Sequence, residues 1–248
     1  MKTTQDPEVE VKAAIESLYK VFRRYTLVKH VEGCPCCVKN EDKRALESAP
    51  LRQLPSEKLS RFAFKVLTTW GDTNDLKHFL PRILELVLSA EGIGCDEEVV
   101  FGKLGLASWK SWAEDEQSSV KMYFRAGWHL ILSQPEPPVE PDTWLCGMAR
   151  ADEALTLYLS DWANSRGSSA YQHLVAFIDL NQAPYIKHHS LGNAFWPDSP
   201  AGVAEVCNWL SDPRTREQLE ALYFENQAAE FAPTLAEAIK RLELIAQQ

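Results

Sequence analysis

The sequence contains no uninterrupted apolar run that approaches the roughly 18 residues of a membrane-spanning helix. Its first residues, 1–7, also lack the apolar core of a secretory signal peptide. These two absences predict a cytoplasmic protein with no membrane partner.

Positive charge is scarce, because 26 lysine and arginine residues stand against 35 aspartate and glutamate residues, for a formal net charge of −9. An acidic surface repels the phosphate backbone, which argues against nucleic acid as a partner. The charge favours another protein as the partner, a basic one above all, although it also serves solubility alone.

Motifs of the commonest enzyme classes are missing as well. The sequence has no glycine-rich phosphate loop, no G-x-S-x-G elbow and no H-E-x-x-H zinc-protease motif. These absences lower the expectation of catalysis, and whether the chain is an enzyme stays open, with a preference for no.

Strand patterns are absent too, because no stretch alternates clearly with a period of two and only residues 25–31 are doubtful. The spacing of apolar residues instead predicts helices at residues 7–28, 42–47, 56–71, 75–90, 97–105, 108–133, 142–164, 168–180, 201–210, 215–226 and 234–246. We therefore predict an all-α protein of stacked antiparallel helical hairpins, an irregular HEAT-like helical array. It is predicted to be a single helical domain over 1–248, with a candidate internal boundary at the proline-rich segment 134–141.

Residues 60–90 carry the most informative pattern and predict a helical hairpin. Ser56 is the predicted cap of the first helix, which is expected to end at Trp70-Gly71, and Asp72 is a natural cap for the second. Pro81 interrupts the second helix, and we predict a kink there rather than a restart.

The sharpest chemical signal is the CPCC tetrapeptide at residues 34–37. Cys34 and Cys37 have the two-residue gap that lets two thiolates reach one tetrahedral zinc ion. Because no second C-x-x-C or H-x-x-x-H follows, folding would have to bring in the remaining ligands from four candidates: Cys36, His30, His78 and Cys95. The candidate metal site consists of Cys34, Cys36, Cys37 and His78, and zinc is the candidate cofactor.

Two other interpretations of the CPCC tetrapeptide stay open. C-P-x-C resembles the active-site motif of glutaredoxins, in which the first thiol lies at a helix N-terminus and has a lowered pKa. Glutaredoxins place that motif between a strand and a helix, whereas this sequence predicts no strand nearby. The remaining interpretation is that the cysteines are reduced thiols packed at a turn.

Further polar and aromatic residues allow both a functional and a structural role. Asp72, Asp75 and His78 are three residues apart and could share a metal ion or transfer a proton, although the two aspartates also suit a helix N-terminus. Trp109 and Trp112 could lie on an exposed binding face or fill gaps between helices. The irregular region 181–200 holds paired histidines and aromatic rings, which suit either an interaction surface or a loop pinned to the core.

Taken together, the CPCC turn, the segment Leu51-Arg52-x-Leu54 and the run FKxLTTWGDxxDxKHFLPR at residues 64–82 resemble a family of uncharacterised bacterial proteins. The resemblance covers residues 10–90 and implies a bacterial origin. It carries over no activity and no catalytic residue.

These observations favour a helical protein-binding module that holds another protein on an acidic, aromatic-bearing face. An immunity-type protein that neutralises a basic toxin is one concrete version, since it needs complementary charge and no active site. The alternative is a metal-dependent hydrolase that uses the CPCC turn and His78, or a protein with a structural zinc site.

Overall fold

The computed structural model describes residues 6–27 and 30–246. The predicted all-α class is confirmed, because that part of the chain forms 12 helices and no strand, with 69% of the residues helical. None of these helices combines the length and apolar composition that a membrane crossing requires. The chain divides into two compact units, Met1–Gly127 and Trp128–Gln248.

The division falls inside helix α6 (Glu114–Ser133), between Gly127 and Trp128. The proline-rich segment 134–141 follows this helix directly and belongs to the second unit. The prediction of a single domain with a candidate boundary at 134–141 stays a prediction.

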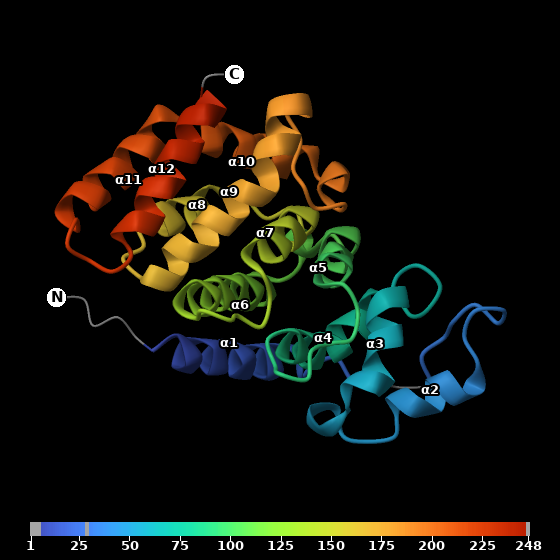
Figure 1. Cartoon of the computed structure of the whole chain (residues 1–248). Helices are drawn as coiled ribbons and strands as arrows, with labels where there is room; N and C mark the ends of the chain where they lie inside the picture. The colour runs from blue at the N-terminus through green and yellow to red at the C-terminus, as the bar shows by residue number, and fades with distance from the viewer. Residues whose placement is uncertain (1–5, 28–29, 247–248) are drawn as a thin grey trace. The chain divides into compact units, whose positions relative to one another are not determined.

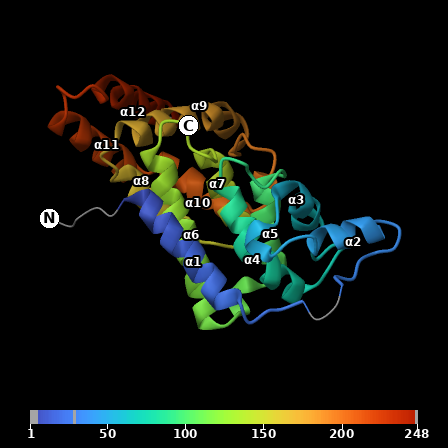
Figure 2. The same cartoon turned by 90° about the horizontal axis from the view of Figure 1, so that it is seen from below.

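The first unit begins with helix α1 (Pro7–Phe22), which starts where its sequence predicts. Asp6 caps the helix by accepting the N–H of Glu8 at 3.0 Å, and proline occupies the first turn. The helix ends at Phe22, well before the predicted end at residue 28. Residue 28 and the N-terminal residues 1–5 lie outside the described residues. Helix α1 packs along α4 (Thr73–Val87), as Figures 1 and 2 show.

Three shorter helices and the start of α6 complete the first unit. These helices are α2 (Asn40–Leu46), α3 (Ser56–Lys65) and α5 (Glu97–Leu106). Helix α3 contacts α2 and α4, which precede and follow it in the sequence, and it also contacts α5. Packing of consecutive helices is the arrangement that a helical array requires.

The predicted end of α3 is wrong, and so is the assignment of Ser56 as its cap, although the helix begins at the predicted residue. The helix stops at Lys65, after which Leu67 takes a φ of +67° and its N–H donates to the carbonyl of Trp70 at 3.2 Å. At the start, Ser56 is the first helical residue rather than the cap, and its N–H donates to the carboxylate of Glu91 at 2.8 Å. A side chain distant in sequence therefore replaces the local cap.

Helix α4 begins at Thr73, two residues before the predicted start, and the predicted capping role of Asp72 is confirmed. Asp72 Oδ1 accepts the N–H groups of Asn74 at 2.8 Å and Asp75 at 3.0 Å, while Asp75 Oδ2 accepts the N–H of Asp72 at 3.0 Å. This reciprocal pair is a capping box. The helix continues through Pro81 to its end, so the restart is excluded, and the kink stays a prediction.

A buried ion pair joins α4 to α6 in the first unit. Lys77 and Glu116 are only 8% and 1% exposed, and Lys77 Nζ lies 2.8 Å from Glu116 Oε2. The same ammonium donates to the hydroxyl of Tyr25 at 3.0 Å and lies 4.3 Å from the ring centroid of Trp112. The charge is thus enclosed by one carboxylate, one hydroxyl and two aromatic rings.

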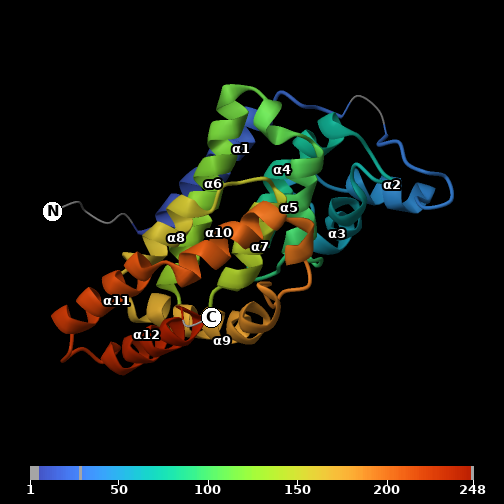
Figure 3. The ribbon, with the colours of Figure 1, turned by 90° about the horizontal axis from the view of Figure 1, so that it is seen from above.

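The second unit contains the end of α6 and six further helices. These are α7 (Pro141–Arg150), α8 (Thr156–Ala163), α9 (Ser168–His188), α10 (Pro200–Ser211), α11 (Pro213–Glu225) and α12 (Ala232–Ala246). Helices α9 and α12 pack side by side, and α12 also contacts α10 and α11 (Figure 3).

Two sequence predictions are corrected in this unit. The predicted helix 142–164 is interrupted after Arg150, where Asp152 takes a φ of +59°. The helix predicted to end at residue 180 continues through Pro184 to His188, so only the second part of the region 181–200 is irregular. Trp196 anchors that part in the core, with its indole N–H 3.2 Å from Asp142 Oδ1.

Tryptophans mainly fill the interior of the two units. Six of them are fully buried: Trp70, Trp109, Trp128, Trp144, Trp162 and Trp196. Trp112 is 8% exposed, so the interpretation of Trp109 and Trp112 as an exposed binding face is wrong. Their rings are needed for packing between helices.

Candidate metal centre

The CPCC tetrapeptide forms a tight turn in the first unit. The carbonyl of Cys34 accepts the N–H groups of Cys37 and Val38, both at 2.9 Å. Pro35 occupies the second position of the turn, where its fixed φ is favourable. Because the first and last residues of such a turn have Cα atoms within about 7 Å, the thiols of Cys34 and Cys37 start from neighbouring backbone positions.

Backbone hydrogen bonds attach this turn to the segment between α3 and α4. The N–H of Cys34 donates to the carbonyl of Thr69 at 2.8 Å, and the N–H of Gly71 donates to the carbonyl of Glu32 at 2.7 Å. The CPCC turn and the TTWGD run, which are far apart in the sequence, therefore form one structural feature.

Gly33 makes this close approach sterically feasible. It pairs with Trp70 in an isolated antiparallel bridge. A Cβ atom at Gly33 would lie 2.8 Å from Val38 Cγ2 and 3.1 Å from Trp70 Cδ1, so a larger residue would push the two segments apart. Val38 and Trp70 are buried, and they hold the base of the turn in the core.

Arg61 of α3 holds the other side of the turn. Its Nη2 donates to the carbonyl of Cys37 at 2.9 Å, and its Nη1 donates to Asp42 Oδ1 at 2.8 Å. Asp42 in turn accepts the N–H of Lys39 through Oδ2 at 2.8 Å. The backbone of the turn is therefore fixed at both ends, which orients its side chains before any ligand arrives.

The three thiols of the turn converge. Cys34 Sγ lies 2.9 Å from Cys36 Sγ, which lies 3.6 Å from Cys37 Sγ, and all three sulfur atoms lie within 4.8 Å of one another. Sulfur atoms that bind one tetrahedral zinc ion at 2.3 Å are about 3.8 Å apart. The separation of Cys36 and Cys37 is close to that value, whereas Cys34 and Cys36 would have to move apart by side-chain rotation before a metal ion could lie between the sulfurs.

The thiols differ in acidity. Hydrogen bonds from the Cys36 thiol and from the Cys36 and Cys37 backbone N–H groups lower the pKa of Cys34. Hydrogen bonding to Cys34 and Cys37, with their nearby negative charge, raises the pKa of Cys36 to about 11. Cys34 thus loses its proton more readily than Cys36 and would bind a metal before Cys36 does.

The other predicted ligands lie elsewhere. His78 Nδ1 is 2.8 Å from the carbonyl oxygen of Tyr25, and the ring packs edge-on against Phe79. His30 bonds through Nδ1 to Glu47 Oε1. Within residues 6–27 and 30–246, neither these histidines nor Cys95 joins the three clustered thiols. The structure therefore brings together three of the four residues of the predicted site and leaves His78 apart.

The glutaredoxin interpretation requires a different environment for the first thiol. In that interpretation Cys34 would begin a helix, whereas here it begins a turn and α2 starts only at Asn40. No strand is assigned in the described part of the chain. The lowered pKa of Cys34 has its source in the turn rather than in a helix N-terminus.

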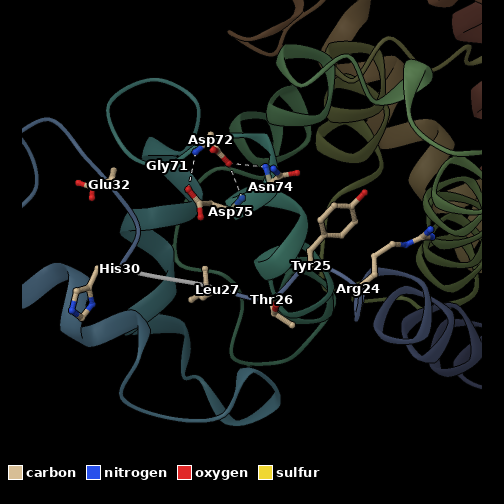
Figure 4. A pocket seen from close by; sticks show the side chains of 10 residues that line it. All are labelled: Arg24, Tyr25, Thr26, Leu27, His30, Glu32, Gly71, Asp72, Asn74 and Asp75. Carbon is tan, nitrogen blue, oxygen red and sulfur yellow. Dashed lines mark hydrogen bonds between the residues drawn. The ribbon is translucent and has the colours of Figure 1, made fainter.

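A hollow of about 660 Å³ lies beside this feature, between the loop after α1 and the start of α4 (Figure 4). It is lined by Arg24, Tyr25, Thr26, Leu27, His30, Glu32, Gly71, Asp72, Asn74 and Asp75. The dashed bonds in Figure 4 show that Asp72 and Asp75 bind backbone N–H groups of α4. This capping role accounts for the spacing of the two aspartates, and His78 does not line the hollow.

Sequence reasoning missed the residues that support the turn. Thr69 and Arg61 reach it through a backbone carbonyl and a guanidinium, and neither carries a recognisable spacing relative to the cysteines. Gly33, directly before the motif, was the one sequence signal of this contact, because glycine often lies where two backbone segments approach each other closely.

No protein-family model, curated protein or solved structure matches this chain. The resemblance to a bacterial family stays a prediction, and any function has to be argued from the chemistry of the chain itself.

Proposed function

We propose that this protein binds one zinc ion through the sulfur atoms of Cys34, Cys36 and Cys37. The observation that supports this proposal is the convergence of three thiols within 4.8 Å on one turn. Thiolates are the ligands that zinc and other soft metal ions prefer.

The surroundings of the turn suit a bound metal. Backbone N–H groups of Cys36 and Cys37 stabilise the negative charge of Cys34, and the guanidinium of Arg61 lies against the carbonyl of Cys37. Three thiolates and Zn²⁺ carry a net charge of about −1, which these donors partly offset. The proposal also assigns the protein to a reducing compartment such as the cytoplasm, where thiols stay free to bind metal.

Elemental analysis of the purified protein, combined with thiol counting, tests the zinc site. We expect about one zinc ion per chain, with three of the six thiols protected from an aromatic disulfide reagent until a chelator is added. Cys34→Ser should lose the metal, whereas Cys95→Ser, which removes a thiol outside the cluster, should retain it. A metal-free protein that stays metal-free after anaerobic incubation with Zn²⁺ would refute the proposal.

The hydrolase alternative receives less support from the geometry. It combines the metal with His78, whose Nδ1 is engaged by the carbonyl of Tyr25 and which lies outside the thiol cluster. A binding role for the metal requires no such partner, and it is the role that we propose.

A basic protein partner, as in an immunity-type protein, is a second proposal, supported by the net charge of −9. It no longer rests on exposed tryptophans, since Trp109 and Trp112 are buried. The test is calorimetric titration with a basic nuclease-like polypeptide at low and high salt. Tight binding that weakens with salt is expected, and no binding at either salt concentration would contradict it.

A further inference from the structure

The thiol cluster provides three ligands where zinc takes four. Structural zinc sites are almost always four-coordinate and tetrahedral. In the part of the chain that the structure describes, the sulfur atoms of Cys34, Cys36 and Cys37 form a group that no histidine, carboxylate or further cysteine joins. The fourth position of the proposed zinc site therefore has no ligand from the surrounding fold.

The fold also resists a rearrangement that would supply one. The turn is fixed by the bond from Cys34 N–H to Thr69 and by the bond from Arg61 to Cys37. His78 is held by the carbonyl of Tyr25 on a continuous helix. Of the two candidate histidines, His78 would have to give up this bond to reach the thiols, and His30 would have to give up its bond to Glu47.

The open position is accessible. Cys36 and Pro35 are exposed, and Cys34 and Cys37 are partly exposed, so the sulfur atoms lie at the surface of the unit. Catalytic zinc sites keep such a position for water or substrate, but those sites have a pocket that holds the substrate. Here the hollow beside the turn is lined by none of the three cysteines, and the ligand class that strengthens a thiol site is another thiolate.

We propose that a thiolate from a second, small molecule occupies the fourth position, and that the CPCC turn exchanges zinc with thiol-bound zinc in this way. This inference rests on the proposed zinc site. The incoming thiol gives its proton to the buffer and forms a Zn–S bond, and the water molecule that filled the fourth position leaves. For transfer, Zn–S bonds to the turn then break, the cysteines regain protons, and no electrons are exchanged.

The first test is the coordination number of zinc in the loaded protein, measured by X-ray absorption with and without glutathione as the probe. We expect three sulfur ligands and one lighter ligand without the probe, and four sulfur ligands in its presence. S-methylglutathione is the matched control, because it keeps the charge and size of the probe but has no thiol to ionise. It should leave three sulfur ligands.

The second test is the rate at which the loaded protein gives up zinc to a chromogenic chelator. If the thiol enters the coordination sphere before zinc leaves, a tenfold increase in glutathione below the concentration that fills the fourth position should raise the rate about tenfold, whereas S-methylglutathione should not change it. Cys95→Ser is the control variant and should behave as the unmodified protein.

The outcomes separate this inference from the proposed function. Zinc that binds but keeps one light ligand, and leaves at a rate independent of glutathione, would overturn the exchange while leaving the zinc site intact. Four sulfur ligands that appear without glutathione as protein concentration rises would also overturn it, because a second copy would then be the donor. A protein that binds no zinc would refute both proposals.

Discussion

The buried pair of Lys77 and Glu116 allows the sharpest test of what holds the first unit together. Replacing Lys77 with methionine keeps the length of the side chain but removes the ammonium that lies 2.8 Å from Glu116 Oε2. The carboxylate is 1% exposed and cannot turn to water. Breaking one partner of a buried ion pair typically costs about 3–5 kcal/mol, so we expect Lys77→Met to lose that much free energy of unfolding.

Urea denaturation at pH 7, followed by circular dichroism, measures this loss. Lys58→Met is the matched control, because Lys58 is an exposed lysine on a helix of the same unit, and it should change stability by less than about 0.5 kcal/mol. The double variant Lys77→Met/Glu116→Leu should recover much of the loss, since it leaves no buried charge. A single-variant loss below about 1 kcal/mol would refute the reasoning.

The pair also predicts a dependence on pH. Burial raises the pKa of Glu116, but hydrogen bonds from Lys77 and Tyr25 outweigh it, so the folded pKa lies below the ordinary value. A carboxyl with a lowered pKa stabilises the fold above its unfolded pKa of about 4.3, and that stabilisation disappears as the pH falls through the folded value. In Lys77→Met the largest of the lowering contributions is removed, so the difference in stability between the two proteins should shrink below about pH 4.

Two further predictions concern the same unit. Gly71 has a φ of +70°, and a Cβ atom there would lie 3.1 Å from atoms of Phe62, Asp75 and Val31. Gly71→Ala should therefore lose more free energy of unfolding than the roughly 1–2 kcal/mol that the left-handed conformation alone costs. Gly92→Ala is the control in the same urea assay and should show only the conformational cost, because Gly92 has a φ of +66° and nothing within 4 Å of its Cβ position. Burial, with the hydrogen bond to Glu85, raises the pKa of Tyr19, so stability should decline as the pH rises above about 10. The free energy of unfolding of Tyr19→Phe should decline less over that pH range than that of the unmodified protein. An equal decline in both proteins would contradict the prediction and assign the effect to other groups.

Local signals in the sequence predicted the starts of helices better than their ends. Asp6 before Pro7, and Asp72 before the second helix of the hairpin, are caps whose bonds close within three residues, so the spacing alone contains the information. The end of α3 at Lys65 is different, because the following turn forms a bridge to Gly33. No periodicity within 56–71 reports a contact that lies so far back along the chain.

At the thiol site too, the local contacts were predictable from the sequence and the distant ones were not. The two-residue gap between Cys34 and Cys37 predicted neighbouring thiols, and the turn brings the sulfur atoms together. The assignment of His78 as a ligand needed a three-dimensional distance that helical spacing cannot provide. For Trp109 and Trp112 the sequence allowed both an exposed and a buried position, and only the packing of the folded chain shows that both are buried.

The compactness of the cysteine motif has a consequence for what the metal contributes. All three sulfur atoms come from four consecutive residues, so zinc would close no long loop and join no distant helices. An unfolded chain would retain the same three ligands, and a ligand that binds both states adds little to the free energy of unfolding. Zinc at this turn would therefore contribute little to the stability of the fold, and it could bind and dissociate while the helices around it stay folded.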